Sequence, residues 1–220
     1  MKKLVLSMMC GACICALSFG QSKKAQPLFS ADLSNADYDK SVWSVDTKGV
    51  LSASADKPIW TKDEYENFEL TLEFKNDHCT NSGVFIYGSD SRNRAANSME
   101  VQIADDYCPK WPDWHANWRC GAIFGHLAPS QPNVVKKPGK WNQMKITAKG
   151  KKVVVVLNGK QIIDMDMNLW TSGTVNPDGS AIPSWLPRPY AELPTKGQIG
   201  FQGKHGGATI WFRNIKIREL

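Results

Sequence analysis

A run of strict alternation near residue 70 constrains the fold of this chain most. Phe68, Leu70, Leu72 and Phe74 are apolar, and a polar or charged residue follows each of them. Because the side chains of a β-strand point alternately to opposite faces, a period of two predicts a strand with one buried and one solvated face. Helical periodicity is almost absent from the rest of the chain.

Short strand patterns recur on both sides of this run. Asn158-Gly159 is a strong signal for a two-residue hairpin, and Asn81-Ser82-Gly83 is interpreted as a turn. Many short strands separated by turns predict an antiparallel all-β domain of sandwich or jelly-roll type. Further strands are expected over residues 84–87, 99–105, 141–148, 152–157, 160–165, 198–202 and 209–217.

Two long segments interrupt this rhythm, at residues 107–138 and 169–196, and both are rich in proline and tryptophan. The chain has nine tryptophans, and five of them lie in these segments: Trp111, Trp114, Trp118, Trp170 and Trp185. Long loops in a compact domain are often functional. Their indole rings either stack on the apolar face of a sugar or pack the loops onto the sandwich.

The first 20 residues have the pattern of a signal peptide. Lys2 and Lys3 precede an apolar run over residues 4–17, and Ser18-Phe19-Gly20 offers small residues at a cleavage site. We therefore expect an exported protein, periplasmic or secreted, with a single domain over residues 21–220. Lipoprotein processing at Cys10 is a less favoured alternative. No further apolar run follows in the sequence, so no membrane-spanning helix is predicted.

The net charge of +6 falls to +4 once Lys2 and Lys3 are removed. The remaining basic residues are scattered, and the small clusters at 136–137 and 149–152 adjoin proline or glycine. Such clusters are typical of solvated turns, so we expect no nucleic-acid partner.

Three cysteines, Cys79, Cys108 and Cys120, remain in the mature chain. Cys108 and Cys120 flank the first tryptophan-rich segment and could form a disulfide across it, which would leave Cys79 unpaired. The alternative is that all three pack as small buried hydrophobic residues. None of the common zinc-binding spacings is present.

Residues 98–106 contain the best candidate for an acid or a base. In the expected strand, Met99, Val101 and Ile103 share one face, while Glu100 and Gln102 share the other. An acid beside an amide on a sheet face is either solvated or lines a polar cleft. Asp105 is five positions from Glu100, an odd offset that places it on the opposite face of a regular strand. A bulge could bring it to the same face as Glu100; without one, we expect Asp105 to be a turn or cap residue.

Two histidines lie among glycines, where the backbone can approach a ligand closely. His126 follows Gly125, and His205 precedes Gly206. Asn81 and Ser82 could supply hydrogen bonds to a polyol, or only form a turn. No nucleophile elbow, phosphate loop or dinucleotide fingerprint is present.

Eight short motifs in this order resemble the 3-keto-disaccharide hydrolase domain family, and together they extend from about residue 27 to the C-terminus. The motifs are Phe68-Glu69-Leu70, Asn81-Ser82-Gly83-Val84-Phe85, Glu100-Val101-Gln102-Ile103, Gly121-Ala122-Ile123-Phe124-Gly125, Gly139-Lys140-Trp141-Asn142, Leu157-Asn158-Gly159, Gly197-Gln198-Ile199-Gly200-Phe201-Gln202 and Phe212-Arg213-Asn214-Ile215.

The resemblance implies a concanavalin A-like jelly-roll sandwich of two antiparallel sheets, with a ligand cleft on the concave one. It also implies an activity, the cleavage of glycosides whose sugar is already oxidised at C3. The motif residues carried over by position are Asn81, Ser82, Glu100, Gln102, His126, Trp141, Asn142, Gln202, His205, Arg213 and Asn214.

A C3 ketone acidifies the C2 hydrogen, so one base can eliminate the group at C1, and water can then add. We expect Glu100 or His126 to be this catalytic base. Asn81, Ser82, Gln102, Asp105, Trp114 and His205 are the expected substrate-binding residues.

Two other functions remain open at this stage. One is a laminarinase-like glycosidase that uses Glu100 and Asp105 on unmodified glycans, and the other is a non-catalytic carbohydrate-binding module. A divalent metal could polarise the ketone, but the chain shows no convincing ligand set and we assign no cofactor.

Overall fold

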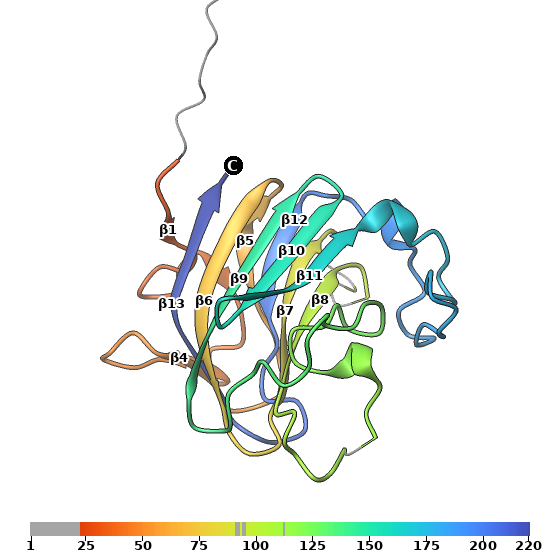
Figure 1. Cartoon of the computed structure of the whole chain (residues 1–220). Helices are drawn as coiled ribbons and strands as arrows, with labels where there is room; N and C mark the ends of the chain where they lie inside the picture. The colour runs from red at the N-terminus through yellow and green to blue at the C-terminus, as the bar shows by residue number, and fades with distance from the viewer. Residues whose placement is uncertain (1–22, 91–92, 94–95, 112) are drawn as a thin grey trace, which may run out of the picture.

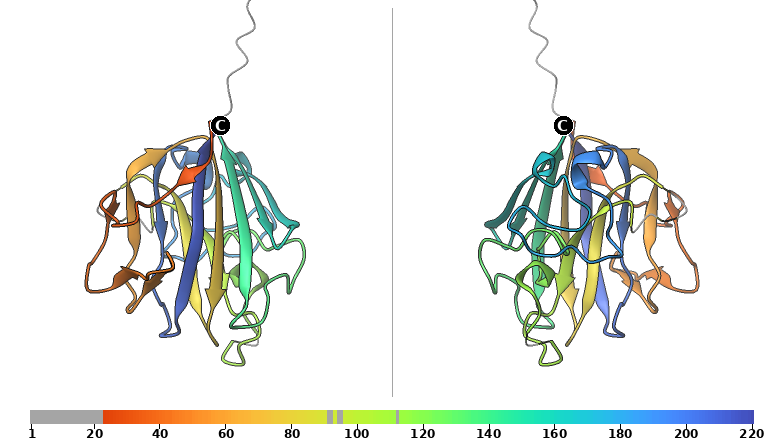
Figure 2. Two further views of the ribbon diagram at one scale, coloured as in Figure 1. Left: turned by 90° about the vertical axis from the view of Figure 1, so that its left-hand side faces the viewer. Right: turned by 90° about the vertical axis from the view of Figure 1, so that its right-hand side faces the viewer.

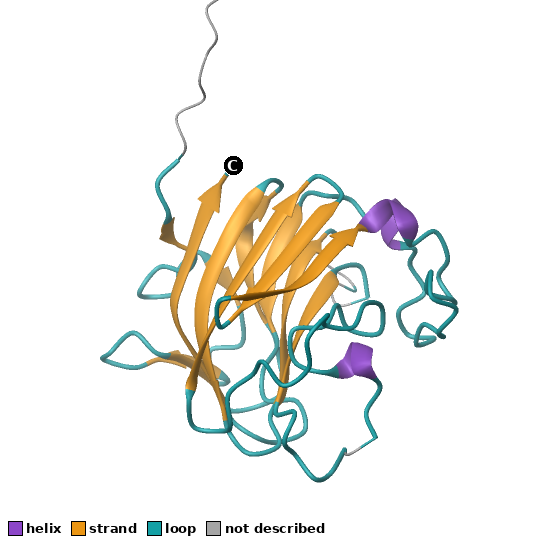
Figure 3. Cartoon of the chain, viewed as in Figure 1, coloured by secondary structure: helices purple, strands orange, loops and turns teal. Residues whose placement is uncertain are grey.

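Two antiparallel β-sheets pack face to face in the computed structural model, which describes residues 23–90, 93, 96–111 and 113–220 (Figures 1 and 3). The larger sheet has eight strands in the order β11-β10-β9-β6-β13-β4-β3, and β1 also pairs with β13. The smaller sheet has five strands in the order β2-β5-β12-β7-β8. The predicted all-β jelly roll is confirmed.

The larger sheet is built from β1 (Gln26–Pro27), β3 (Trp43–Val45), β4 (Leu51–Ala53), β6 (Phe68–Asn76), β9 (Trp141–Lys149), β10 (Lys152–Leu157), β11 (Lys160–Asp166) and β13 (Ile210–Glu219). The smaller sheet is built from β2 (Ala36–Asp37), β5 (Ile59–Tyr65), β7 (Asn81–Gly88), β8 (Met99–Ala104) and β12 (Gly197–Phe201).

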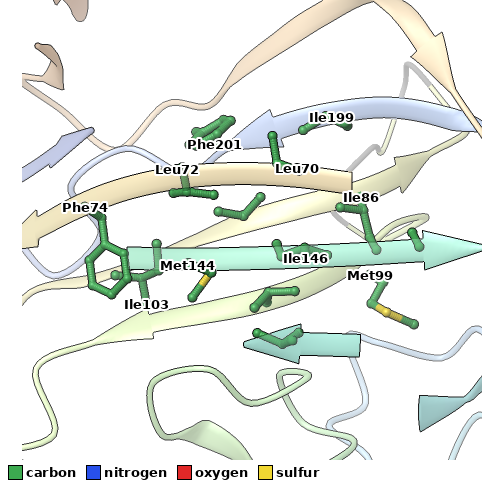
Figure 4. Packing of buried hydrophobic residues seen from close by; sticks show 14 of the residues in the cluster. Leu70, Leu72, Phe74, Ile86, Met99, Ile103, Met144, Ile146, Ile199 and Phe201 are labelled. Atoms are coloured by element: carbon green, nitrogen blue, oxygen red, sulfur yellow. The ribbon is translucent and has the colours of Figure 1, made fainter. Parts of the chain in front are cut away.

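The alternation around residue 70 makes β6 the centre of the larger sheet, between β9 and β13. Its buried face meets the apolar face of the smaller sheet in a continuous hydrophobic layer (Figure 4). Each large apolar side chain buried there contributes roughly 1.5–3 kcal/mol to folding. The labelled residues of this layer are Leu70, Leu72, Phe74, Met144 and Ile146 from one sheet, and Ile86, Met99, Ile103, Ile199 and Phe201 from the other.

Strand β8 confirms the two-faced pattern expected for residues 98–106. Met99, Val101 and Ile103 are fully buried in the layer between the sheets. Glu100 and Gln102 therefore lie on the outer face of the smaller sheet. The strand is regular up to Ala104, so no bulge turns Asp105 toward that face.

The predicted turn at Asn81-Ser82-Gly83 is wrong, because these residues open strand β7. Asn81 pairs with Ala104 and Gly83 pairs with Gln102, while the Gln202 backbone N–H donates to the Gly83 carbonyl from the other side. Pairing on both sides overrides the local turn preference of these residue types. The strands before residue 66 were not predicted from the sequence.

The two tryptophan-rich segments remain largely irregular and pack on the same side of the sandwich (Figure 2, right). Short 3₁₀ turns lie within the described parts of these segments, η1 (Ala116–Trp118) and η3 (Tyr190–Glu192), and a third, η2 (Met167–Leu169), ends where the second segment begins. Among the described residues, no helix is long and apolar enough to span a membrane.

The disulfide joins Cys79 to Cys108, and Cys120 is a buried free thiol. The expected Cys108–Cys120 bridge is therefore wrong, as is the alternative of three unpaired cysteines. The turn before β7 and the turn after β8 lie side by side because the two strands are paired, which brings Cys79 within reach of Cys108. The bridge ties the start of the first tryptophan-rich segment to the sheet.

We expect the double variant Cys79→Ala/Cys108→Ala to lose about 3 kcal/mol of unfolding free energy, because the 29-residue separation sets the chain entropy released on unfolding. Cys120→Ala, the matched control, should cost about 1 kcal/mol, as a small core truncation does. Urea denaturation measures both. A thiol titration of the unreduced, denatured mature chain should find a single thiol, and three would contradict the bridge.

Candidate active site

A cleft of about 630 Å³ opens on the outer face of the smaller sheet, within the size range of small-molecule sites. Strands β7, β8 and the end of β12 form its floor, and the two tryptophan-rich segments form a wall. The floor residues are Asn81, Phe85, Glu100, Gln102, Gln202 and His205, and the aromatic residues of the wall are Trp114, Trp118, Phe124 and Trp185.

Glu100 lies on the cleft floor directly over Gly83. A side chain at position 83 would overlap the Glu100 carboxylate, so the carboxylate occupies the space that glycine leaves open. Burial, and to a smaller extent the negative charge of Asp56, raises the pKa of Glu100 to about 8. At neutral pH this carboxyl is thus close to its titration midpoint, where a group can both accept and donate a proton.

His205 and Asp56 form a second polar pair at the edge of the cleft. The Nδ1 atom of His205 lies 2.6 Å from Oδ2 of Asp56, although 149 residues separate them in sequence. An isolated β-bridge to Asn81 positions His205 beside the floor. When the Asp56 carboxylate accepts a hydrogen bond from Nδ1–H, the ring can use Nε2 toward a ligand.

Amide side chains cover the floor between these groups. Nε2 of Gln102 donates to Oδ1 of Asn81 at 3.3 Å, which orients both amides. The side-chain oxygens of Gln102 and Gln202 are buried and have no hydrogen-bond partner among the described residues. An unpaired buried acceptor is costly, so these two oxygens suit the hydroxyl groups of a polyol ligand.

The wall is a continuous chain of aromatic contacts. The indole N–H of Trp111 donates to the carbonyl of Asp105, just after β8, which anchors the first ring. Trp111 stacks on Trp114 at 4.3 Å between ring centroids, and Trp114 meets Trp118 edge to face at 5.9 Å. Trp118 then contacts Trp185 at 6.4 Å, which joins the two tryptophan-rich segments.

The structure brings five of the expected site residues to one cleft: Glu100, Asn81, Gln102, Trp114 and His205. Ser82 is not among them, because its side chain faces the interior and donates to the Gln202 carbonyl at 2.8 Å. Asp105 is also elsewhere. It is fully buried in the turn after β8, where its carboxylate accepts the backbone N–H groups of Cys79 and Tyr107.

His126 lies behind the floor and does not line the cleft. Its ring stacks on Tyr190 at 4.0 Å between centroids, and Tyr190 in turn contacts the backbone of Glu100. The Nδ1 atom of His126 is 2.8 Å from the Phe124 carbonyl, and burial lowers the pKa of His126 to about 4. The ring is therefore neutral. Because it is also absent from the cleft lining, we interpret His126 as a packing residue.

Phe85, which lines the cleft, and Asp56, which contacts His205 at its edge, were not predicted as site residues from the sequence. Phe85 could have been found, because it shares a strand face with Asn81 and Gly83. It stacks on Trp60, whose ring covers Gly200. Asp56 has no local signal, since it lies in a loop and meets His205 only in the folded chain.

One described group, formed by His78, Cys79 and Asp105, brings three metal-ligand atoms within 4.8 Å of one another. Cys79 is in the disulfide, so its sulfur cannot act as a thiolate ligand. The group lies outside the cleft and does not fit a metal centre for chemistry there.

The fold and the cleft define a jelly-roll protein with a carboxyl-bearing, tryptophan-lined site. The chain matches the family profile described as "3-keto-alpha-glucoside-1,2-lyase-like domain" over residues 24–218. The chain therefore belongs to this family, and the resemblance identified from its motifs is confirmed.

Three known proteins illustrate this relationship. The 3-keto-disaccharide hydrolase of Bacteroides thetaiotaomicron is 27% identical over 176 residues, which cover 71% of this chain and 60% of that protein. The chain thus spans less than two thirds of that relative. The crystal structure of a candidate glycosyl hydrolase from Parabacteroides distasonis is 60% identical with a TM-score of 0.87, over 90% of this chain and all of that one. A Bacillus licheniformis β-glucanase shares the fold alone, with a TM-score of 0.51, 8% identity, and coverage of 91% and 98%.

We expect Glu100→Gln to stabilise the protein at alkaline pH. Because the folded pKa of Glu100 is raised, its ionisation opposes folding. This penalty is absent below about pH 4.5, where the carboxyl is protonated in both states, and grows as the pH rises to about 8. Glu100 keeps part of its surface exposed, so we expect a gain of about 2 kcal/mol at pH 9 and none at pH 4.

Urea denaturation at the two pH values measures this difference. Glu64→Gln is the matched control, because Glu64 is an exposed residue of strand β5 in the same sheet. An equal effect of Glu100→Gln at both pH values would show that the carboxyl is not destabilised by burial.

Proposed function

We propose that this protein cleaves the glycosidic bond of 3-keto-glycosides, such as 3-keto-disaccharides, by elimination followed by hydration. The observation that carries the proposal is the Glu100 carboxyl, whose pKa is raised to about 8 on the floor of a tryptophan-walled cleft. Among the described residues that line the cleft, Glu100 is the only carboxylic acid. Membership of the family and the name of the Bacteroides relative support the same reaction.

The reaction needs one base, and Glu100 takes this role. The C3 ketone acidifies the C2 hydrogen, and the Glu100 carboxylate removes it as a proton. The resulting enolate expels the aglycone oxygen from C1, which leaves a double bond between C1 and C2. Water then adds at C1, and protonated Glu100 returns the proton to C2, so the net result is hydrolysis. A base with a pKa near the working pH suits both proton transfers.

The remaining floor residues hold the sugar and assist the leaving group. The unpaired oxygens of Gln102 and Gln202 accept hydrogen bonds from sugar hydroxyls, and the Asn81 amide donates to a ring substituent such as the ketone oxygen. His205 in its protonated form, held by Asp56 through Nδ1, gives the Nε2 proton to the departing aglycone oxygen, and Nε2 then takes a proton from the water that adds at C1. The aromatic wall excludes water from Glu100 and stacks on the sugar ring.

The cleft geometry favours this chemistry over the two alternatives. A retaining glycosidase needs two carboxyl groups about 5 Å apart across one cleft, and Asp105 is buried elsewhere. A non-catalytic carbohydrate-binding module does not require a carboxyl with a raised pKa, and ionising such a group lowers the stability of the fold.

We also propose that the protein is exported after removal of residues 1–20, which lie outside the described part of the chain. The disulfide between Cys79 and Cys108 supports this proposal, because such bridges persist in oxidising compartments. The site of action would then be the periplasm or the medium.

Purified mature protein should release the aglycone from at least one member of a panel of 3-keto-glucosides. Glu100→Gln should lower kcat/KM by at least about 100-fold, which is typical for loss of a catalytic base, while Glu64→Gln leaves it unchanged. Parallel assays with a chelator test for a metal requirement. Release from no member of the panel, or cleavage of unoxidised trehalose or laminarin, would refute the proposed function.

The pH dependence distinguishes a base from an acid. If Glu100 acts as the base, kcat/KM rises with pH through a limb near pH 8, where the carboxyl ionises. Asp56→Asn removes a negative charge that raises the pKa of Glu100, so it should move this limb to lower pH. An activity that falls as pH rises through the same range would indicate that Glu100 is a general acid, as in a conventional glycosidase.

A further inference from the structure

A second cavity of about 370 Å³ lies beside the cleft, between the two tryptophan-rich segments. Trp118 and Trp185 line both cavities, so the two cavities adjoin at these rings. The reaction described above uses only the first cavity. The second one therefore has the size and the position to accept a further part of the same ligand.

The ring of Trp185 is exposed where the two cavities adjoin, so it is available to stack on a ligand. Its side chain is 59% exposed, although tryptophan is usually well buried. Trp170, in the same segment, is only 6% exposed and donates its indole N–H to Asn176. The segment thus buries one tryptophan for packing and presents the other to both cavities.

Hydrogen bonds hold the second cavity in shape without a ligand. The Asn176 side chain accepts from the Trp170 indole and donates to the Gly125 carbonyl and to Oγ of Ser180. Gly125 also packs so closely on Pro183 that a side chain there would meet it. These contacts hold the two tryptophan-rich segments together, so binding of a ligand in the second cavity would require little ordering of the chain.

The polar edge of the second cavity carries a negative charge. Asp178 is exposed, and its Oδ1 accepts the hydroxyl and backbone N–H of Ser180. These bonds hold the pKa of Asp178 below its usual range, so it remains ionised. A carboxylate accepts hydrogen bonds from sugar hydroxyls and repels anionic groups.

We propose that this second cavity is the subsite for the leaving half of the substrate, and that it takes a neutral sugar ring. The inference rests on the proposed function for the position of the reacting ring, and it adds the chemical class of the aglycone. The ring stacks on the exposed face of Trp185 and donates a hydroxyl to Asp178. Aglycones with a phosphate or a carboxylate are disfavoured by Asp178.

The test compares substrates that share the oxidised ring and differ in the leaving group. The first pair is 3-ketotrehalose and methyl 3-keto-α-glucoside, and the second is 3-ketocellobiose and methyl 3-keto-β-glucoside. The variants are Asp178→Asn, which removes the charge, and Ala181→Trp, which fills the cavity. Asp32→Asn is the matched control, because Asp32 makes the same local contact to Ser34 and lines neither cavity.

The quantity measured is the ratio of kcat/KM for the disaccharide to kcat/KM for the methyl glycoside. We expect Asp178→Asn to lower this ratio about tenfold, the effect of losing one hydrogen bond to a charged group, and Ala181→Trp to lower it because the new ring occupies the space of the second sugar. Asp32→Asn should leave it unchanged. An unchanged ratio in both cavity variants would overturn the subsite.

A binding measurement separates this inference from the proposed function. If the wild-type protein cleaves none of the four compounds, the proposed reaction fails, and calorimetry on Glu100→Gln protein then tests the subsite alone. Tighter binding of the disaccharide than of the methyl glycoside, with the difference lost in Asp178→Asn, would support the subsite. Equal affinities would overturn it.

Discussion

The apolar layer between the two sheets is the constraint on which the site depends. Met99, Val101 and Ile103 must face this layer, so Glu100 and Gln102 must face the cleft. A slip of one residue in the register of β8 would bury a carboxyl in the core and expose three large apolar side chains. The energy of the core thus fixes the position of the candidate base, although Met99, Val101 and Ile103 do not themselves line the cleft.

Desolvation of Glu100 links the stability of this protein to its proposed chemistry. A side chain at position 83 would overlap the Glu100 carboxylate, and the aromatic residues of the wall line the same cleft as this carboxyl. The same burial that raises the pKa of Glu100 makes its ionisation unfavourable for folding. The wall is held by contacts between side chains and loop backbone rather than by regular secondary structure: local contacts run from the Asp105 carbonyl through Trp111 to Trp118, and one long-range contact joins Trp118 to Trp185.

Much of the fold and part of the site could be predicted from the sequence. Most strands after residue 66 were, because alternation is a local property that the hydrophobic effect imposes on any half-buried strand. The same alternation predicted which residues of β8 lie on its buried face and which on its outer face. Asn81-Ser82-Gly83 was misread as a turn, because pairing on both sides outweighs residue preference. His126 was expected in the cleft, but its ring stacks on Tyr190, and the neighbouring Gly125 packs against Pro183.

The sequence by itself determined the all-β class, the family, and the face on which Glu100 and Gln102 lie, since each depends on short-range pattern. Only the tertiary structure decided three long-range pairs: Asp56 with His205, Cys79 with Cys108, and Trp118 with Trp185. The order of strands in the sheets sets which loops meet, and spacing along the chain does not encode that order. For this reason the partner of Cys108 is Cys79 and not Cys120: the pairing of β7 with β8 brings Cys79 close to Cys108.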